Sequence, residues 1–556
     1  MIETCGTVPG ALPLIGHAPQ LLRDPLGFLS SLPEYGDLVG IRLGPLDVLV
    51  VCDPELTRRV LREDGVFDKG GPLIDRAREV IGDGLGTCPH ADHRRQRRLT
   101  QPAFHPKRLP GYARTMAEQV ELVAGGWRDG QVIDVLAETT ALSMRITVAA
   151  IFAAALPAAV FDQTLEDFAA VVDGIFMRTL MPGRLDGLPT PGNRRYGKAC
   201  ARLRRTVERI ADEYRGDGTD HGDLLSMLVA ARDVGVLVGG VGAAGAADIA
   251  SGAGDTGAAS AADAADIAGG MGGTGAASTA NATDIAGGMG GTGDTGASAV
   301  DAAGIAGGTG AAGVAGAASA ADATDIAGGM GGTGGIGSAG AGRSLSDSEI
   351  SDQAVTFLIS GTETTAALMA WTLHLLAQHP EIQRRVQVEV DTVLAGAASA
   401  THEHLPDLKL TGRVLTEALR IYPPVWIVTR AVTADTQLGR HKIPAGATLA
   451  YSPYLIHRRA DVHPDPDRFD PDRWTSAPDR ITFLPFGSGA RRCIGDTFAV
   501  TEATLALATI TARWELHAVP GRRVRPRPRT TLAPNGLMLR LVDRGTSPQG
   551  IDDGIA

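Results

Sequence analysis

Cysteine is scarce in this chain of 556 residues, which contains only five. They are Cys5, Cys52, Cys88, Cys200 and Cys493. No two of them have the C-x-x-C spacing, so the sequence argues against a disulfide framework, a zinc site and an iron–sulfur cluster. The N-terminal region also lacks a long apolar run, because Pro9, Pro13, Arg23 and Asp24 interrupt it. With neither a signal peptide nor a membrane anchor expected, the sequence predicts a soluble cytoplasmic protein.

A long internal segment, from about residue 235 to 342, lacks aromatic residues, lysine, arginine and glutamate altogether. It consists almost entirely of Gly, Ala, Ser, Thr and Asp, and its D-I-A triplets place Ile249, Ile267 and Ile285 at intervals of 18 residues. Such a segment cannot bury enough apolar surface to offset its chain entropy, so we expect it to be disordered. Its nine Asp residues account for most of the net charge of −11, so this charge says little about the substrate.

The segments on either side of this repeat suit one folded body that is interrupted by an expanded surface loop. We therefore divide the chain into a first part of the domain at 1–234, the insert at 235–342, a second part of the domain at 343–543 and a polar tail at 544–556. The alternative for the insert is a tether for a partner protein, although its composition offers no binding anchor.

Near the C-terminus, one cysteine lies in a glycine-rich frame, F-x-x-G-x-R-x-C-x-G. The fixed positions are Phe486, Gly489, Arg491, Cys493 and Gly495. A lone cysteine is usually a small buried hydrophobic residue, but this frame favours a thiolate ligand to haem iron. A haem thiolate pushes electron density onto the iron and favours cleavage of the O–O bond. Glycines let the backbone pass close to a flat macrocycle, and Arg491 is placed to reach a haem propionate.

This frame resembles the haem-binding loop of the cytochrome P-450 superfamily, and the resemblance covers nearly everything outside the insert and the tail. It implies a mainly α-helical fold with a small β-sheet region, in one large domain. It also implies haem b as the cofactor, with Cys493 as the axial ligand of the iron.

A long helix is expected from about Asp347 to Gln378. Ser346 and Glu349 form a capping-box pattern at its start, and Pro380 marks its end. The polar run S-G-T-E-T-T at 360–365 interrupts its apolar sequence and invites a local widening of the helix. Alone, such a run would usually be a solvated turn. It resembles the family's distal-helix motif, in which Gly361 precedes an acid and an alcohol, here Glu363 and Thr364, that deliver protons to dioxygen.

Two further motifs resemble family features. Glu417 and Arg420 match E-x-x-R, although such a pair is often an ordinary surface ion pair. With Arg468, they are expected to form a structural Glu/Arg/Arg network behind the haem. Asp467 stands where the family usually has Glu, which keeps the charge.

A basic cluster at 93–98 would by itself indicate a solvated face or a patch for nucleic acid or membrane. In bacterial members of the family, H-x-x-x-R holds the haem propionates. The resemblance therefore assigns His93 and Arg97 to this role, with Arg430 as a further propionate ligand. It implies neither a nucleic-acid partner nor a membrane partner, and the remaining arginines of this helix are expected to face an acidic redox partner.

The sequence contains no flavin or ferredoxin module, so the resemblance implies electrons from a separate ferredoxin and its reductase with NAD(P)H. The expected reaction is oxidation of an apolar small molecule by dioxygen, because the segment at 425–428 and Phe357 are apolar where the family has its distal cavity. The N-terminal third, including 32–38 and 67–71, is most similar to bacterial terpene-oxidising members. The alternatives are a peroxygenase that uses hydrogen peroxide, a non-catalytic haem sensor and a scaffold.

Overall fold

The computed structural model describes residues 5–152, 156–180, 188–217, 223–229, 345–479 and 481–545. These residues belong to one compact unit, which is formed by Met1–Gly273 and Arg343–Ala556. The insert at 235–342 lies outside the described residues, as does the tail from 546 onward, so their predicted disorder and the division of the chain remain predictions.

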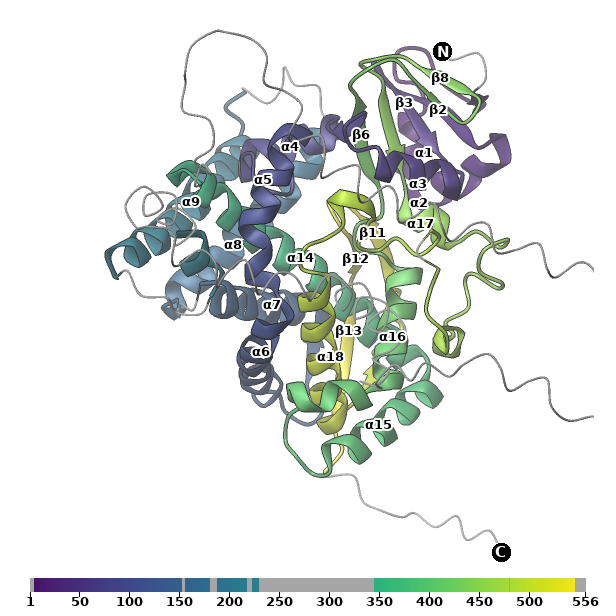
Figure 1. Cartoon of the computed structure of the whole chain (residues 1–556). Coiled ribbons are helices and arrows are strands. Elements are labelled where there is room, and N and C mark those ends of the chain that lie inside the picture. Colours follow the sequence, from purple (N-terminus) through teal and green to yellow (C-terminus); the bar gives the residue numbers. More distant parts are fainter. Residues whose placement is uncertain are drawn as a thin grey trace, which may run out of the picture. The chain divides into compact units, whose positions relative to one another are not determined.

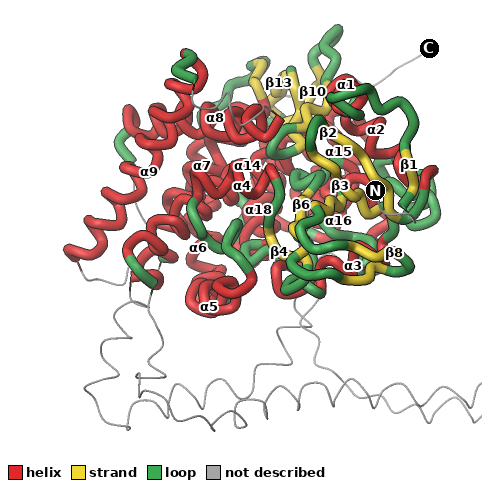
Figure 2. Tube along the Cα trace, turned by 90° about the horizontal axis from the view of Figure 1, so that it is seen from above, coloured by secondary structure: helices red, strands yellow, loops and turns green. Residues whose placement is uncertain are grey.

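Most of the described chain is helical, and Figure 2 shows helices and strands gathered in different parts of this unit. The helices of the first segment are α1 Ala18–Arg23, α2 Pro25–Ser31, α3 Pro54–Arg62, α4 Pro72–Ile81, α5 His90–Thr100, α6 Leu109–Ala124, α7 Val135–Phe152, α8 Ala158–Leu180 and α9 Pro191–Asp217. Those of the second segment are α14 Asp347–Gln378, α15 Pro380–Leu394, α16 Lys409–Ile421, α17 Pro453–His457 and α18 Asp496–Arg513.

The largest sheet has six strands in the order β1-β2-β3-β9-β6-β4. These strands are β1 Gly6–Thr7, β2 Leu38–Leu43, β3 Leu46–Val51, β9 Thr448–Tyr451, β6 Val428–Val432 and β4 Phe67–Lys69. The smaller sheets comprise β10 Trp514–Ala518, β13 Met538–Asp543 and β5 Val132–Asp134, then β11 Arg525–Pro528 with β12 Leu532–Asn535, and β7 Thr436–Leu438 with β8 His441–Ile443. The predicted mainly helical fold with a small sheet region is confirmed.

The predicted bounds of the long helix are also confirmed, since α14 spans Asp347–Gln378. Its capping box is present: the Ser346 hydroxyl accepts from the Glu349 backbone N–H, and the Glu349 carboxylate accepts from the Ser346 N–H at 2.7 Å. The helix continues through 360–365 without a break, so the predicted widening is not seen. Within this stretch, Thr364 Oγ1 donates a hydrogen bond of 2.7 Å to the Ser360 carbonyl one turn earlier.

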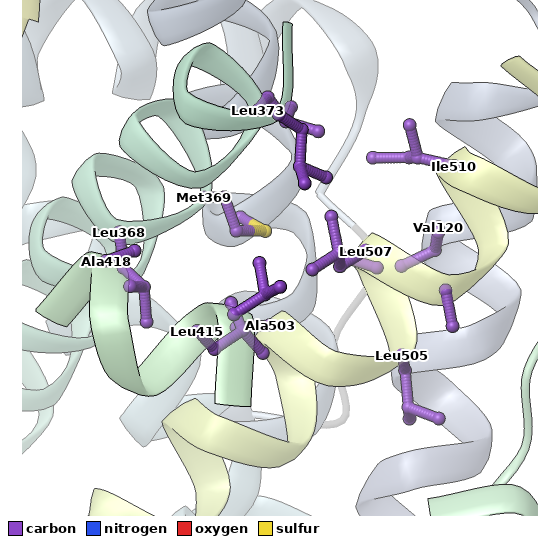
Figure 3. Close-up of a cluster of buried hydrophobic side chains, with 14 of the residues drawn as sticks. Val120, Leu368, Met369, Leu373, Leu415, Ala418, Ala503, Leu505, Leu507 and Ile510 are labelled. Atoms are coloured by element: carbon purple, nitrogen blue, oxygen red, sulfur yellow. The ribbon is translucent and has the colours of Figure 1, made fainter. Parts of the chain in front are cut away.

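The core surrounds α14, which contacts α7, α16 and α18 (Figure 1). A helix that is apolar on several faces must be enclosed by other elements. Figure 3 shows the result: Leu368, Met369 and Leu373 of α14 meet Leu415 of α16 and Leu507 of α18. These buried side chains hold in place the middle of α14, where the predicted distal residues lie.

Among the described helices, α7 alone is long and apolar enough to span a membrane, with a mean hydropathy of 1.4 over 18 residues. Of this helix, 61% is buried inside the protein, and it packs along α14. It therefore serves as a helix of the core.

Candidate active site

Cys493 lies in a tight loop between the 3-10 turn Gly489–Arg491 and α18. Its N–H donates to the Phe486 carbonyl at 2.9 Å, which closes the loop. Gly489 has a φ of +68°, and a Cβ there would lie 2.4 Å from the Leu61 carbonyl oxygen. The protein itself therefore requires this glycine, because the loop passes directly against the end of α3. That is a different reason from the predicted approach to a macrocycle.

Gly495 has a different role, because a Cβ there would meet the Phe104 ring at an ordinary 3.5 Å. A backbone hydrogen bond from Gly495 instead lowers the pKa of the Cys493 thiol. Burial has the larger and opposite effect, and with Asp496 it raises that pKa to about 11. The thiol still has exposed surface, so it is reachable although protein surrounds it at longer range. Without a cation to bind, Cys493 stays protonated at neutral pH.

Basic side chains gather around this loop. Burial, together with the nearby Arg430 and Arg491, lowers the pKa of Lys69 to about 7. Burial also lowers the pKa of His93 to about 3, helped by Arg491, Arg97 and Lys69. The sheet brings two of these residues together, since β4 and β6 pair Lys69 with Arg430. Lys69, Arg97, Arg430 and Arg491 therefore lie within electrostatic range of one another or of His93, which stays neutral at physiological pH.

Within the parts of the chain that the structure describes, Lys69, His93, Arg97 and Arg430 form no ion pair with a carboxylate. Their hydrogen bonds include Lys69 Nζ to the Gly86 carbonyl, Arg97 Nη1 to the Arg492 carbonyl at 2.6 Å, and Arg430 Nη1 to the Thr429 carbonyl at 3.2 Å. Cations that are partly or fully buried without anionic partners, here Lys69, Arg97 and Arg430, are unfavourable, and a neutral His93 can still donate a hydrogen bond. This cluster therefore suits a ligand with carboxylates. The two propionates of a haem beside Cys493 fit that requirement.

Arg491 is engaged differently from the other cations. Its guanidinium forms ion pairs with Asp64 at 3.1 Å and Asp68 at 2.8 Å, and it donates to the Cys88 carbonyl at 2.9 Å. Its side chain is 2% exposed. Its Nη1 also donates to Cys88 Sγ at 3.8 Å, so four of its five N–H groups fasten the cysteine loop and one remains for the predicted propionate contact.

Lys69 was missed in the sequence analysis. Its neighbours Phe67 and Gly71 marked only a family likeness, and no local motif sets this lysine apart. Its position becomes informative through the strand register, which pairs it with Arg430 more than 350 residues later in the chain.

The middle of α14 has accessible surface, although the helix is buried on both sides of it. Residues 353–359 and 365–373 are buried, whereas Ser360 is exposed and Gly361 and Thr364 are partly exposed. A Cβ on Gly361 would lie 3.2 Å from Thr147 Oγ1, so this glycine allows α7 to approach closely. Small molecules can therefore reach α14 at the predicted acid and alcohol.

Glu363 contacts a residue outside α14. Its Oε1 accepts a hydrogen bond of 2.8 Å from Thr531 Oγ1. Burial raises the pKa of Glu363 to about 7, the Thr531 bond opposes this, and Asp173 adds to it. A carboxyl with this pKa both releases and binds protons at neutral pH.

A second buried carboxyl, Glu502 of α18, was also missed. It is fully buried, and its Oε1 accepts from Ser143 Oγ at 2.6 Å, a hydroxyl that also lies 3.4 Å from the Gly361 carbonyl. Burial raises the pKa of Glu502 to about 8. Its Oε2 has no hydrogen-bond partner among the described residues, and neither do the hydroxyls of Thr147 and Thr362.

The segment at 425–428 and the side chain of Phe357, both predicted to face the substrate, are largely packed into the protein. Trp426 is 5% exposed and donates from Nε1 to the Arg529 carbonyl at 2.8 Å. Phe357 is also buried, and its ring lies 5.4 Å from that of Phe104. In the segment 425–428, Val425, Ile427 and Val428 keep partial exposure.

The E-x-x-R motif forms a buried network. Glu417 and Arg420 are both fully buried and share two hydrogen bonds of 2.8 Å. The prediction for Arg468 was wrong: its side chain is exposed, and only its carbonyl accepts from Arg420, at 3.1 Å. Arg473 supplies the second guanidinium, at 3.4 Å from Glu417, because its place in the turn Pro471–Trp474 directs it inward.

Comparison with known proteins agrees with this geometry. Residues 7–233 and 336–541 match the family model described as Cytochrome P450. The chain belongs to the cytochrome P450 family. It is 37% identical over 544 residues to pentalenene oxygenase of Streptomyces avermitilis, covering 97% of each chain. It is 36% identical over 523 residues to cyclooctat-9-en-7-ol 5-monooxygenase of Streptomyces melanosporofaciens, covering 93% of this chain and 91% of that relative.

Among solved structures, the haem domain of cytochrome P450DA is similar to this P450, with a TM-score of 0.70 and 24% identity over 98% of each chain. That similarity supports the fold. The family and its monooxygenase relatives confirm the enzyme class and the haem cofactor predicted from the sequence. Membership also implies a hydrophobic substrate, dioxygen and redox partners.

Proposed function

We propose that this P450 inserts one oxygen atom from dioxygen into a C–H bond of a terpene or a similar apolar metabolite. The observation that carries the proposal is the cluster of basic side chains without carboxylate partners beside Cys493, because it suits a haem bound at that thiol. The substrate class is supported by the two Streptomyces relatives, which are named for the oxidation of pentalenene and of cyclooctat-9-en-7-ol.

When bound, haem supplies the activation of dioxygen, which thiolate ligation favours. In this proposal Cys493 would hold the haem iron as a thiolate, and its thiol would give up its proton on binding. Lys69, His93, Arg97 and Arg430 would hold the propionates. Arg491 fastens the cysteine loop and would offer them its remaining N–H group.

Protons reach the distal side through two residues of α14. Thr364 has accessible surface, and its hydroxyl now donates to the Ser360 carbonyl at 2.7 Å. A rotation about one bond would release this hydroxyl toward a ligand. Glu363, with its pKa near 7, resupplies the proton, while the buried residues on both sides of this stretch exclude bulk water.

Electrons come from a separate ferredoxin and its reductase with NAD(P)H. The support is the exposed basic surface of α5, where Arg94 and Arg98 point away from the buried His93. An acidic redox protein would be attracted to such a surface. We further propose a cytoplasmic location, in which these carriers are present.

We also propose that the insert at 235–342 is a disordered loop expansion between 1–234 and 343–543, with a separate tail at 544–556. Joining Asp233 to Arg343 through a short Gly/Ser linker should leave substrate affinity and turnover nearly unchanged, because shortening a flexible loop has little entropic cost. Loss of activity with the native redox partners, but not with surrogate ones, would instead favour the role of the insert as a tether for a partner protein. Loss of haem would show that the insert belongs to the fold.

The test of the function uses purified haem-loaded protein and a panel of terpenes and fatty acids. A terpene should shift the Soret absorbance from low spin to high spin and should be oxidised when a surrogate ferredoxin, a reductase, NADPH and dioxygen are present. Responses only to fatty acids would overturn the substrate class. Product formation with hydrogen peroxide alone, at an equal rate, would instead identify a peroxygenase.

A further inference from the structure

The tip of the β11–β12 hairpin contacts two separate parts of the enzyme. β11 and β12 pair antiparallel, with Pro528 opposite Leu532. The loop between them consists of Arg529, Thr530 and Thr531, and a backbone hydrogen bond of 3.0 Å from Arg529 N to the Thr531 carbonyl closes it. Movement of one loop residue therefore affects the others.

Thr531 is the buried member of this loop. It is 5% exposed, and its hydroxyl donates to Glu363 at 2.8 Å. The next residue, Leu532, is fixed by two hydrogen bonds of 2.9 Å, from Trp371 Nε1 to its carbonyl and from its N–H to the Pro424 carbonyl. Thr531 thus holds the Glu363 carboxyl from a loop that is fixed at its Leu532 end.

The other two loop residues contact α8. Thr530 Oγ1 donates to the Val172 carbonyl at 3.0 Å, and Arg529 Nη1 lies 2.7 Å from Asp173. The Asp173 side chain is 52% exposed, and an exposed ion pair typically contributes only about 0 to 1 kcal/mol. The ion pair with α8 is therefore weak, whereas the hydrogen bond between Thr531 and Glu363 is partly buried.

We propose that Thr531 is a positioning residue for Glu363, and that the hairpin tip links the orientation of this carboxyl to the contact with α8. The proposal rests on the proton-delivery role of Glu363. The charged groups that face this contact are Asp173 on α8, Arg527 on β11 and Arg529 in the hairpin loop. When α8 lies against the tip, Thr531 holds Glu363; when this contact breaks, the carboxyl gains freedom to turn.

The first test needs no turnover. Infrared spectra of the haem-loaded protein, minus those of Glu363→Gln, isolate the C=O stretch of the protonated Glu363 carboxyl. The pH midpoint of this band should rise by about one pH unit in Thr531→Val, because the charged form loses a hydrogen bond. Thr531→Ser keeps the hydroxyl and should keep the native midpoint. An unchanged midpoint in Thr531→Val overturns the positioning role.

The link to α8 is tested with two matched charge changes. Arg529→Gln removes the shorter of the two ion pairs with Asp173 and leaves that of Arg527 at 3.7 Å, whereas Arg525→Gln removes an equal charge from the same strand region without any such pair. Arg529→Gln should move the Glu363 midpoint and increase hydrogen exchange of the α8 amides, and Arg525→Gln should do neither. Equal effects of the two variants would show that the loss of a positive charge, and not the contact with α8, moves the midpoint. That result would overturn the proposed link.

Turnover then separates this inference from the proposed function. Thr531→Val should move the alkaline limb of the pH profile for product formation by as much as the infrared midpoint, and it should have no further effect in a Glu363→Gln background. If Glu363→Gln alone leaves turnover unchanged, the proton-delivery role fails, although the Thr531 hydrogen bond stands. An added effect of Thr531→Val in that background overturns the positioning role.

Discussion

Two buried glutamates of this P450, Glu417 and Glu502, have opposite surroundings. Both oxygens of Glu417 are occupied, by Arg420 and by a Trp474 N–H at 2.8 Å, and Arg473 lies close by. Glu502 has one hydroxyl partner and one oxygen without a partner among the described residues. A compensated buried charge fixes a structure, whereas an uncompensated carboxyl favours its protonated form and can exchange protons.

The same difference separates the region around Glu417 from the region around Glu363 and Glu502. The Glu417 network ties α16 to the turn Pro471–Trp474, and no group in it depends on a ligand. On the distal side, Glu363 and Glu502 both have raised pKa values, and the hydroxyls of Thr147 and Thr362 have no partner among the described residues. We infer that the first region serves stability and the second serves proton movement.

The largest expected effect comes from breaking the Glu417 network. Glu417→Gln leaves the buried Arg420 guanidinium without its counter-charge, and breaking a buried pair typically costs about 3 to 5 kcal/mol. We expect loss of haem during purification and a large fall in the midpoint of denaturant unfolding. A variant that folds with native stability would show that this region does not serve stability.

Glu502→Gln should stabilise the folded protein at high pH, whereas Glu417→Gln destabilises it. The folded-state pKa of about 8 lies above the ordinary 4.5, so the folded protein retains a proton that the unfolded chain releases between these values. Stability therefore falls as pH rises from 4.5 to 8, by at most roughly 5 kcal/mol from this group.

The Gln variant should lose this contribution to the pH dependence and exceed the wild type in stability at pH 9, while differing little at pH 4. Urea unfolding at both pH values measures the effect. A wild type that gains stability over this range relative to the variant would contradict the assignment.

Thr364→Ala should leave stability, haem content and substrate affinity nearly unchanged, because the side chain lies on the accessible part of α14. Without the hydroxyl, protonation on the distal side becomes disordered, so a severalfold larger share of the consumed dioxygen should end as hydrogen peroxide. Thr364→Ser should restore coupling. Unchanged coupling in Thr364→Ala would remove Thr364 from the proposed proton path.

The smallest effects separate the two arginines near Glu417. Arg473→Ala removes contacts with Glu417 and with the Pro464 carbonyl, and should cost about 1 to 2 kcal/mol of unfolding free energy. Arg468→Ala changes an exposed side chain and should stay within about 0.5 kcal/mol of the wild type. Equal losses in the two variants would contradict the assignment of Arg473 to the network.

Short sequence motifs predicted the features that depend only on residues close together in the chain, such as helix ends and tight loops. The capping box at Ser346 and the proline at 380 give both ends of α14, and the glycine-rich frame identifies the loop around Cys493. Sequence spacing did not show which arginine side chain turns inward, so the prediction named Arg468, whereas Arg473 lies beside Glu417. Lys69 and Glu502 could not be found in this way, because their meaning depends on partners in distant segments, Arg430 and Ser143.

The most direct test of the account is the spectrum of the reduced carbon monoxide complex in a set of single Cys→Ser variants. If Cys493 is the thiolate ligand, the wild type and the variants at Cys5, Cys52, Cys88 and Cys200 should show the far-red Soret band of thiolate ligation, and Cys493→Ser should lose it. A normal band in Cys493→Ser would contradict the central claim.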